Sequence, residues 1–209
     1  MHESTQCHIN HLHFNLMRFS PRDYYHCIRV KEVAGKFCEK LALTKNECEN
    51  IAYAGSLHDI GKIHINPDIL FKNGKLTNNE FDEIKKHTTE GVCLLNKGLF
   101  THSMHKLITD VISEHHEQCN GKGYPNHKSA DNINFASKVV ALCDVFDALS
   151  SKRHYKHMYC KVSTRKILTM QAEKFDNELL EVFLAHFDEL FAFKEIVYQT
   201  QRNICENLI

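Results

Sequence analysis

Residues 135–149 have the sequence FASKVVALCDVFDAL, with apolar side chains at helical spacing. Asp144 comes four residues after Val140 and four residues before Ala148. The spacing predicts a helix that carries Asp144 on its apolar face. A buried carboxylate without a partner is energetically expensive, so Asp144 needs a partner group or a metal ion. The segment therefore predicts both a helical core and a polar site inside it.

The same spacing of apolar residues recurs over residues 30–41, 107–115 and 179–191, and it is clearest in the last. Thr77 and Glu80 fit a capping box, which predicts the start of a helix that continues to Leu94. Few segments alternate with a period of two residues. We therefore predict an all-α fold, a bundle of helices.

The length of 209 residues fits one domain, and such a chain can bury a core without disulfides or structural metals. Hydrophobic residues make up 43% and charged residues 25%, values that exclude a disordered chain, a fibre and a coiled coil. Residues 1–20 are polar and His-rich and lie outside the helical pattern. We predict a flexible, solvated arm over 1–20 and the folded domain over 21–209.

Charge and cysteine content limit the partners and the location. Lys plus Arg and Asp plus Glu both number 26, so no basic excess supports binding to a nucleic acid polymer. No apolar run is long enough to cross a bilayer, and the first residues lack an export signal, so no membrane partner is expected. The 9 cysteines contain no CxxC pair, which favours reduced thiols and a cytoplasmic location.

Seven imidazole and carboxylate side chains come from apolar helical contexts: His26, His58, Asp59, His87, His115, His116 and Asp144. For any one of them, a hydrogen-bonded core residue is the commoner explanation. Seven inward-pointing groups in one bundle instead indicate a dinuclear metal centre. Nitrogen and oxygen ligands without a thiolate favour iron or manganese over a structural zinc. Two such ions can activate a bridging water and clamp a phosphodiester oxygen.

Several motifs follow one another in a fixed order: HCIRV at 26–30, HDIGK at 58–62, NPDILFKNGKLTNNEFDEIKKHTTEG at 66–91, HHEQCNGKGYP at 115–125 and DVFDALSSKRHYK at 144–156. In this order they resemble the HD-GYP domains, a branch of the HD superfamily of metal-dependent phosphohydrolases. The resemblance covers roughly residues 22 to 193. It implies an all-α HD-type bundle around a dinuclear metal site, and a catalytic domain that hydrolyses cyclic di-GMP to pGpG, to GMP or to both.

The resemblance also implies roles for individual residues. One metal ion would be bound by His26, His58, Asp59 and Asp144, and the other by Asp59, His87, His115 and His116. Asp59 would bridge the two ions, and a metal-bridging hydroxide would attack phosphorus while the ribose 3′ oxygen leaves. Lys62, the second catalytic residue, would stabilise the charge on the phosphoryl oxygens. The implied substrate-binding residues are Lys62, Gly123, Tyr124, Pro125, Arg153 and Lys156.

Taken without the resemblance, these substrate-binding residues have plainer explanations. Lys62 fits a surface lysine, and Arg153 and Lys156 fit a solvated basic patch. Gly123 and Pro125 would belong to a structural turn, with the Tyr124 ring covering the core.

The sequence also departs from the family pattern. Arg22 occupies a position where many members carry a glutamate that helps to hold a third metal, so we predict two divalent ions. Asn120, Lys138 and His154 replace a customary Asp, Arg and Pro. These changes leave the predicted ligands intact but bear on the substrate contacts.

Three functions remain open at this level. The first is a cyclic di-GMP phosphodiesterase. The second is a phosphodiesterase for another cyclic dinucleotide, such as 3′,3′-cGAMP. The third is a catalytically inactive binding module, although such members typically lose ligands or the GYP tripeptide, and both are present here. An apolar part of the C-terminal helix could form a homodimer. Control of activity is expected from a regulatory protein partner, from metal or redox state, or from expression.

Overall fold

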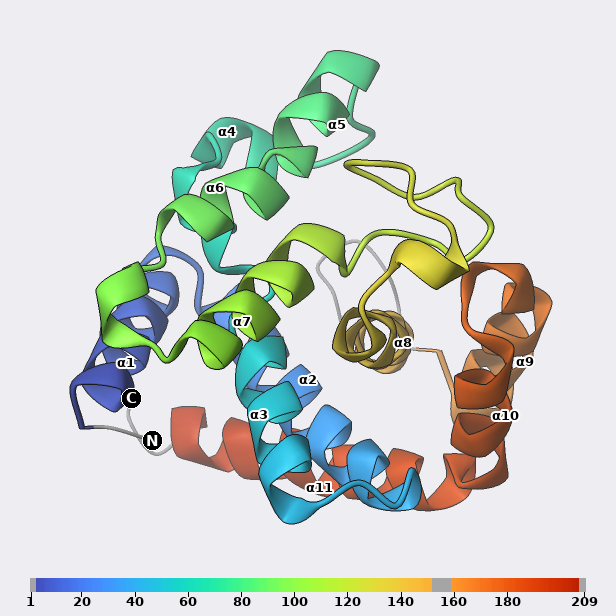
Figure 1. Ribbon diagram of the computed structural model, residues 1–209. Helices are drawn as coiled ribbons and strands as arrows, with labels where there is room; N and C mark the ends of the chain where they lie inside the picture. The colour runs from blue at the N-terminus through green and yellow to red at the C-terminus, as the bar shows by residue number, and fades with distance from the viewer. Residues whose placement is uncertain (1–2, 152–158, 207–209) are drawn as a thin grey trace.

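The computed structural model describes residues 3–151 and 159–206. Over these residues the chain forms helices and no strand, apart from one isolated bridge between Asn120 and Ser129, which confirms the predicted all-α fold (Figure 1). The helices of seven or more residues are α1 (Glu3–Phe19), α2 (Pro21–Lys40), α3 (Lys45–Gly55), α5 (Asn78–Lys85), α6 (His87–Cys93), α7 (His102–Glu114), α8 (Phe135–Ser150), α9 (Lys161–Met170), α10 (Asn177–Ala185) and α11 (Phe187–Glu206). The short ones are η1 (Ile60–His64), α4 (Pro67–Leu70), η2 (Lys97–Leu99), η3 (Ala130–Asn132) and η4 (Ala172–Lys174).

The predicted capping box at the start of α5 is confirmed. The Thr77 hydroxyl accepts a hydrogen bond from the Glu80 amide at 3.3 Å, and the Glu80 carboxylate accepts one from the Thr77 amide at 2.8 Å. These two bonds satisfy amides that the helix itself leaves without partners. The start of α5 is therefore fixed by its own sequence.

The prediction that this helix continues to Leu94 is wrong, because the chain turns at Lys86 between α5 and α6. The Thr88 and Thr89 hydroxyls each donate a 2.9 Å hydrogen bond to a carbonyl three residues back, at Lys85 and Lys86. Such local bonds compete with the helical ladder. The break makes His87 the first residue of a new helix.

The apolar stripe over residues 179–191 also spans two helices, which meet at His186. The apolar residues keep their helical spacing across the break because both helices pack against the same core residue, Phe146. The rings of Phe183 and Phe187 pack against the ring of Phe146, with centroids 5.2 and 5.8 Å apart.

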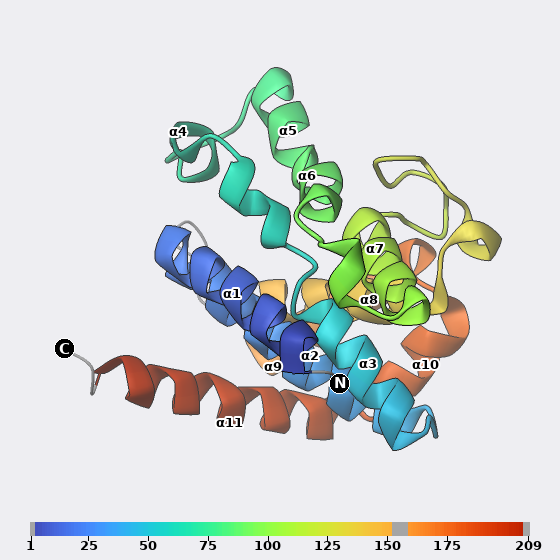
Figure 2. The same ribbon diagram turned by 60° about the vertical axis from the view of Figure 1, so that its left-hand side comes forward.

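The predicted flexible arm over residues 1–20 is wrong for the part that the structure describes. Residues 3–19 form helix α1, and the side chains of Ile9, Leu12 and Leu16 are buried. Their spacing of three and four residues is that of a single helical face. α1 packs against α2 and η1 (Figure 2), and the His13 ring is hydrogen-bonded to the Ser56 carbonyl at 3.1 Å.

Helix α2 packs against α1, α3, α8 and α11. In Figure 1, α8 is seen almost end-on near the middle of the molecule, while α9 and α10 lie to its right. The apolar halves of α2 and α8 meet around Phe37, Phe146 and Phe183, all fully buried. The same two helices also carry His26 and Asp144, so the apolar core supports these polar side chains.

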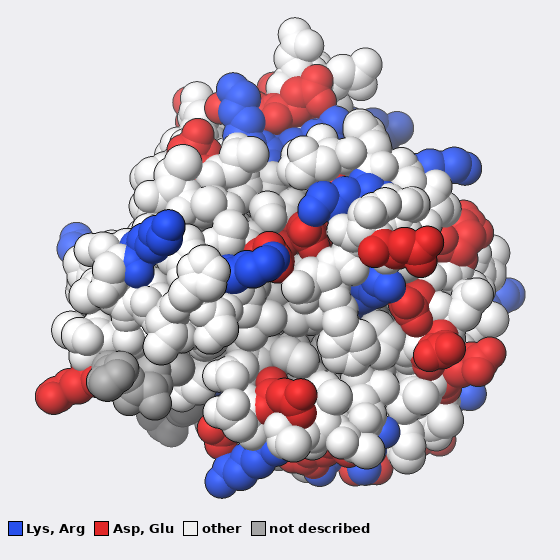
Figure 3. All heavy atoms as spheres, viewed as in Figure 1, with Lys and Arg blue, Asp and Glu red and all other residues white. Residues whose placement is uncertain are grey.

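The surface charge is mixed in sign. On the face drawn in Figure 3, acidic and basic side chains are interspersed, as the zero net charge leads one to expect. Among the described residues, no helix combines the length and the apolar character needed to span a membrane.

Candidate metal centre

The seven predicted ligand side chains come from separate parts of the chain and converge on one place. His26 lies in α2 and Asp144 in α8, while His87 is the first residue of α6. The two doublets sit where helices end: His58 and Asp59 lie between α3 and η1, and His115 and His116 directly follow α7. Breaks in helical structure let adjacent residues point to one centre.

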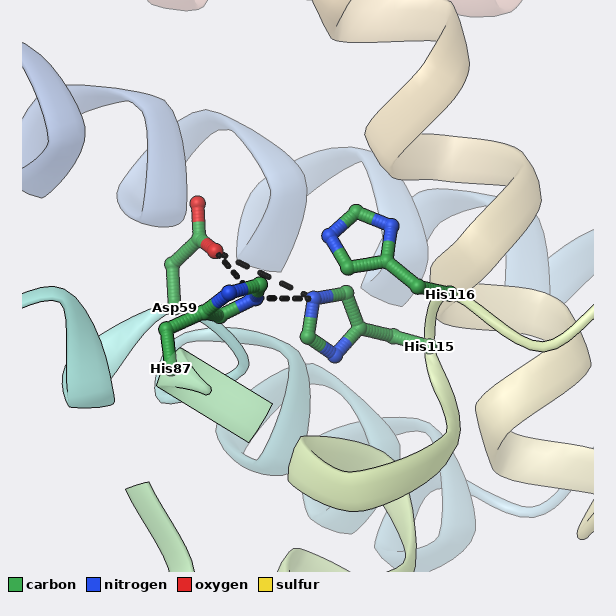
Figure 4. A group of neighbouring side chains, drawn as sticks. All are labelled: Asp59, His87, His115 and His116. Carbon is green, nitrogen blue, oxygen red and sulfur yellow. Dashed lines mark hydrogen bonds and ion pairs between the residues drawn. The ribbon is translucent and has the colours of Figure 1, made fainter. Parts of the chain in front are cut away.

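One group of side chains surrounds the Asp59 Oδ1 atom. His87 Nε2 lies 3.3 Å from it and His115 Nε2 lies 3.8 Å from it, while the two Nε2 atoms are 3.3 Å apart. Together with His116, these residues offer ligand atoms that all lie within 4.8 Å of one another. Figure 4 shows the four side chains pointing toward a common centre.

A second group surrounds the other carboxylate oxygen, Asp59 Oδ2. His58 Nε2 is 3.4 Å and His26 Nε2 is 3.9 Å from this atom. Asp144 Oδ1 lies 3.0 Å from His26 Nε2 and 4.0 Å from His58 Nε2. Asp59 therefore belongs to both groups and turns one oxygen toward each.

The donor atoms are prepared for a cation. In three of the histidines the ring Nδ1 atom is hydrogen-bonded to a main-chain carbonyl of the preceding turn: His58 to Gly55 at 2.7 Å, His87 to Ile84 at 2.7 Å, and His115 to Ile112 at 3.0 Å. Such bonds direct the Nε2 lone pair at a metal. His58 Nε2 and Asp59 Oδ1 are buried and have no hydrogen-bond partner among the described residues. Unsatisfied buried polar atoms are costly, and a divalent cation in each group would satisfy them.

Protonation also suits metal binding. Burial, together with the neighbouring imidazoles, holds the pKa of His115 well below its ordinary value, and burial lowers the pKa of His116 to about 3. Burial alone would raise the pKa of Asp59, but the charge of Lys62 lowers it well below normal. Metal ligands must be deprotonated, so neutral imidazoles beside charged carboxylates form a competent set. The His58 pKa is raised, against the effect of burial, by the Asp59 charge, which a cation would neutralise in place of a proton.

His26 differs from the other histidines, because a carboxylate supports it. Its Nδ1 atom donates to Asp147 Oδ2 at 2.7 Å, and Arg29 donates to both Asp147 oxygens at 2.8 and 3.0 Å. Sequence reasoning missed Asp147. Its position three residues after Asp144, on the same helical face, was the available signal.

The approach of η1 to α6 sets the distance between Asp59 and His87. A Cβ atom on Gly61 would lie 2.0 Å from the His87 carbonyl oxygen and 2.5 Å from the Gly91 amide nitrogen. A Cβ atom on Gly91 would lie 2.7 Å from Ile112 Cγ2. Glycine at 61 therefore permits the contact between main chains, and glycine at 91 leaves room for the Ile112 side chain.

Lys62 lies beside the cluster and not at the open surface. Its Nζ atom is 2.5 Å from Asp59 Oδ2 and 3.4 Å from Asp23 Oδ1. Burial would lower its pKa, but the two carboxylates raise it, so the side chain stays charged. Asp23, a buried residue that also contacts Arg22 at 3.0 Å, was not predicted as part of the site.

A cleft of about 290 Å³ opens beside His26 and Lys62. Its wall also carries Arg22, Lys72 and Phe81, from α2, the segment after α4, and α5. Cationic and aromatic groups therefore face the opening next to the metal-ligand cluster. Cationic groups suit a phosphate, and an aromatic ring suits a nucleobase.

The loop after His116 is fixed by two buried glutamates that sequence reasoning missed. Glu117 accepts hydrogen bonds from the amides of Asn126 and Lys128, at 2.6 and 3.0 Å. Glu114 accepts hydrogen bonds from the Lys128 ammonium group and the Asn134 amide, at 2.6 and 2.8 Å. The loop is therefore held at several points along its main chain.

The predicted substrate-binding residues of this loop have distinct settings. The Gly123 main chain lies against residues 116–118, so that an added Cβ would be 2.4 Å from the Gln118 nitrogen. The Tyr124 ring is stacked on the His116 ring and faces Phe81 edge-on at 6.2 Å. Pro125 is half-buried and follows a cis peptide bond. Arg153 and Lys156 lie outside the described residues.

Comparison with known proteins identifies the family. Residues 9–179 match the HD domain family. The chain therefore belongs to the HD domain family, and its motifs fit the HD-GYP branch.

Two similar proteins have names that state an activity. The chain is 35% identical to 3′3′-cGAMP-specific phosphodiesterase 2 of Vibrio cholerae, over 76% of this chain and 31% of that protein. It is 34% identical to a cyclic di-GMP phosphodiesterase of Thermotoga maritima, over 76% of this chain and 43% of that protein. The chain thus matches less than half the length of either relative.

Solved structures share the fold. A cyclic GMP-AMP-specific phosphodiesterase of V. cholerae superposes with a TM-score of 0.64 at 18% identity, covering 92% of this chain and 50% of that one. The HD domain of the Listeria monocytogenes phosphodiesterase PgpH, in complex with cyclic di-AMP, gives 0.61 at 16% identity, covering 90% and 96%. At these identities the similarity concerns the fold.

Proposed function

We propose that the chain is a metal-dependent phosphodiesterase that opens a cyclic dinucleotide, with cyclic di-GMP as the substrate and pGpG, GMP or both as products. The observation that carries the proposal is the position of Asp59. Its two oxygens face two separate groups of imidazoles, which are completed by His116 on one side and Asp144 on the other. A carboxylate shared in this way suits a pair of cations about 3.5–4 Å apart, a spacing used for phosphodiester cleavage.

The ligand roles follow from the two groups. We assign His26, His58, Asp59 and Asp144 to one divalent ion, and Asp59, His87, His115 and His116 to the other. Nitrogen and oxygen donors without a thiolate favour iron or manganese. When bound, two such ions would supply an activated water and neutralise charge on the phosphodiester.

The remaining residues would bind and orient the substrate. Lys62, held by Asp59 and Asp23, is charged and faces the cleft, where it would stabilise negative charge on the phosphoryl oxygens. The Tyr124 ring is stacked on His116, and the Lys85 ammonium group lies 5.8 Å from its centroid, so a base would stack on this ring beside a cation. Gly123 and Pro125 would keep Tyr124 in this position. Arg153 and Lys156 stay proposals that rest on the sequence motif.

A second candidate substrate is 3′,3′-cGAMP. The similar proteins include enzymes named for cyclic di-GMP and enzymes named for 3′3′-cGAMP, at comparable identity. The metal ligands would be shared, and only the contacts with the bases would differ. A binding module without turnover is less well supported, because all seven ligand side chains and the GYP tripeptide are present.

Location and assembly are further proposals. Eight free cysteines and no disulfide among the described residues support a reducing, cytoplasmic environment. A homodimer or a regulatory protein partner at α11, where Ile196 is 65% exposed, stays a proposal that rests on the sequence.

An anaerobic turnover assay tests the activity. The purified protein, loaded with ferrous or manganous ion, is given cyclic di-GMP or 3′,3′-cGAMP in parallel, and the products are separated by ion-exchange chromatography. Metal is counted on the same samples. We expect about two ions per chain and turnover of cyclic di-GMP. Faster turnover of 3′,3′-cGAMP would identify this dinucleotide as the substrate and would leave the proposed reaction unchanged.

Two variants control this assay. Asp59→Ala removes the shared carboxylate and should abolish turnover. His102→Ala removes an exposed histidine from the first turn of α7 and should change nothing. Metal binding without hydrolysis of either dinucleotide would refute the proposed phosphodiesterase activity and favour a binding module.

A further inference from the structure

Helix α11 lies outside the matched family region, which ends at residue 179. It nevertheless contacts residues that hold the proposed metal ligand His26. In Figure 2 it runs along one side of the molecule, and it packs against α2. Gln201 is 8% exposed, and its Oε1 atom accepts a 3.0 Å hydrogen bond from Arg29 Nη1. Its Nε2 atom donates to the Tyr25 carbonyl at 3.4 Å. The amide thus connects α11 to α2 just beside His26.

From Gln201 a continuous chain of buried hydrogen bonds leads to His26. Arg29 donates from Nε and Nη2 to the two oxygens of Asp147, at 2.8 and 3.0 Å. Asp147 is fully buried and accepts the His26 Nδ1 proton at 2.7 Å on one of those oxygens. Each step joins charged or polar groups that have left water. Displacement of one side chain in this series should therefore displace the next one.

Gln201 binds the third nitrogen of the Arg29 guanidinium group. The pair of bonds to Asp147 engages one edge of that group, and Gln201 engages the remaining Nη1 atom. The Tyr198 ring, also on α11, lies 5.6 Å from the guanidinium carbon. Without Gln201 the Arg29 group could tilt, and the carboxylate that orients His26 would tilt with it.

We propose that Gln201 is a positioning residue for the metal ligand His26, acting through Arg29 and Asp147. The proposal rests on the metal centre assigned above and is independent of the substrate. Partners that orient a metal-bound histidine typically contribute about 10- to 100-fold in metal affinity. Gln201 acts one step farther away than Asp147, so about threefold to tenfold is expected for its loss.

The test is a manganese titration of the metal-stripped protein, in which free Mn²⁺ is measured by electron paramagnetic resonance. Gln201→Met keeps the volume of the side chain and removes the acceptor. Gln201→Asn shortens the side chain and withdraws the acceptor without making the site apolar. Gln201→Glu keeps the acceptor. Thr200→Val is the matched control, because among the described residues this exposed hydroxyl bonds only within its own helix, to the Ile196 carbonyl at 2.9 Å.

We expect Gln201→Met and Gln201→Asn to weaken the affected Mn²⁺ site about threefold to tenfold. Gln201→Glu and Thr200→Val should stay within about twofold of wild type. Thermal unfolding of the metal-free proteins is measured beside the titration. An unchanged affinity in Gln201→Met and Gln201→Asn overturns the proposal, and so does a loss that Gln201→Glu fails to restore. If wild type itself binds no Mn²⁺, the metal centre fails and the inference fails with it.

Discussion

The aromatic ring of Tyr124 lies stacked on the imidazole ring of His116, with centroids 4.7 Å apart and planes inclined by 29°. Both residues lie in the loop between α7 and α8, and a 3.2 Å hydrogen bond from the Tyr124 amide to the His116 carbonyl joins their main chains. The stack therefore links a proposed metal ligand to a proposed base-binding ring. Substrate and metal would meet at this pair.

We predict that Tyr124→Ala raises the KM for the cyclic dinucleotide, since stacking of a base on an aromatic ring contributes about 1–3 kcal/mol. Tyr124→Phe keeps the ring and should leave KM within about twofold. Steady-state kinetics on metal-loaded enzyme, with the metal content measured in each sample, provides the test. An unchanged KM with a reduced metal content would mean that the ring serves His116 alone.

Addition of Mn²⁺ should raise the thermal stability of the metal-free protein. A ligand at 100 times its Kd stabilises the folded state by about 2.7 kcal/mol. For a chain of this size that corresponds to a rise of about 5–10 °C in Tm, which differential scanning calorimetry would record. His58→Ala removes a buried nitrogen that has no hydrogen-bond partner among the described residues, and it should reduce the shift. Equal shifts in both proteins would place the ion elsewhere.

Gly123→Ala should destabilise the protein by about 2–3 kcal/mol, because overpacking of a close contact costs energy of this order. The added methyl group would lie 2.4 Å from both the Gln118 nitrogen and Glu117 Cα. Gly98→Ala is the control, since an added Cβ at this position would lie no closer than 3.5 Å to its nearest neighbour, Asn96 Oδ1. Urea unfolding measures both variants. Similar urea midpoints for the two variants would mean that the loop between α7 and α8 shifts to accommodate the added methyl group.

Leu16→Ala should lower the free energy of unfolding by about 2–5 kcal/mol, as expected for a fully buried leucine. Met17→Ala, one residue further along α1, replaces a side chain that is 36% exposed and should cost far less. Chemical denaturation of both proteins checks this difference. If the two variants proved equally stable, α1 would be detached from the body of the protein in solution.

The error over α1 shows what composition conceals. The buried apolar residues Ile9, Leu12 and Leu16 stand in a segment that is mostly polar and His-rich, so a count of residue types suggests a solvated segment. Their spacing nevertheless defines one face. Helix breaks were hidden for the opposite reason: Phe183 and Phe187 keep helical spacing across His186 because both meet Phe146.

The candidate ligands could be predicted because each is a polar residue in an apolar context, and their order matches a known series. Asp147, Glu114 and Glu117 were missed, because their partners are remote in sequence or are main-chain amides. Asp147 meets a histidine 121 positions away. Sequence spacing carries information within a helix, whereas such contacts depend on how helices pack.

The contact of Gly61 with α6 has a consequence for mutational surveys. In a scan scored by turnover, every substitution of Gly61 should rank with loss of Asp59, because any side chain would push the His87 carbonyl away. Yet Gly61 offers no group to an ion or a nucleotide. The glycine of the HDIGK motif is thus required for the close packing of η1 on α6 and not for chemistry. Sensitivity to substitution at this position reports how little space separates the two main chains.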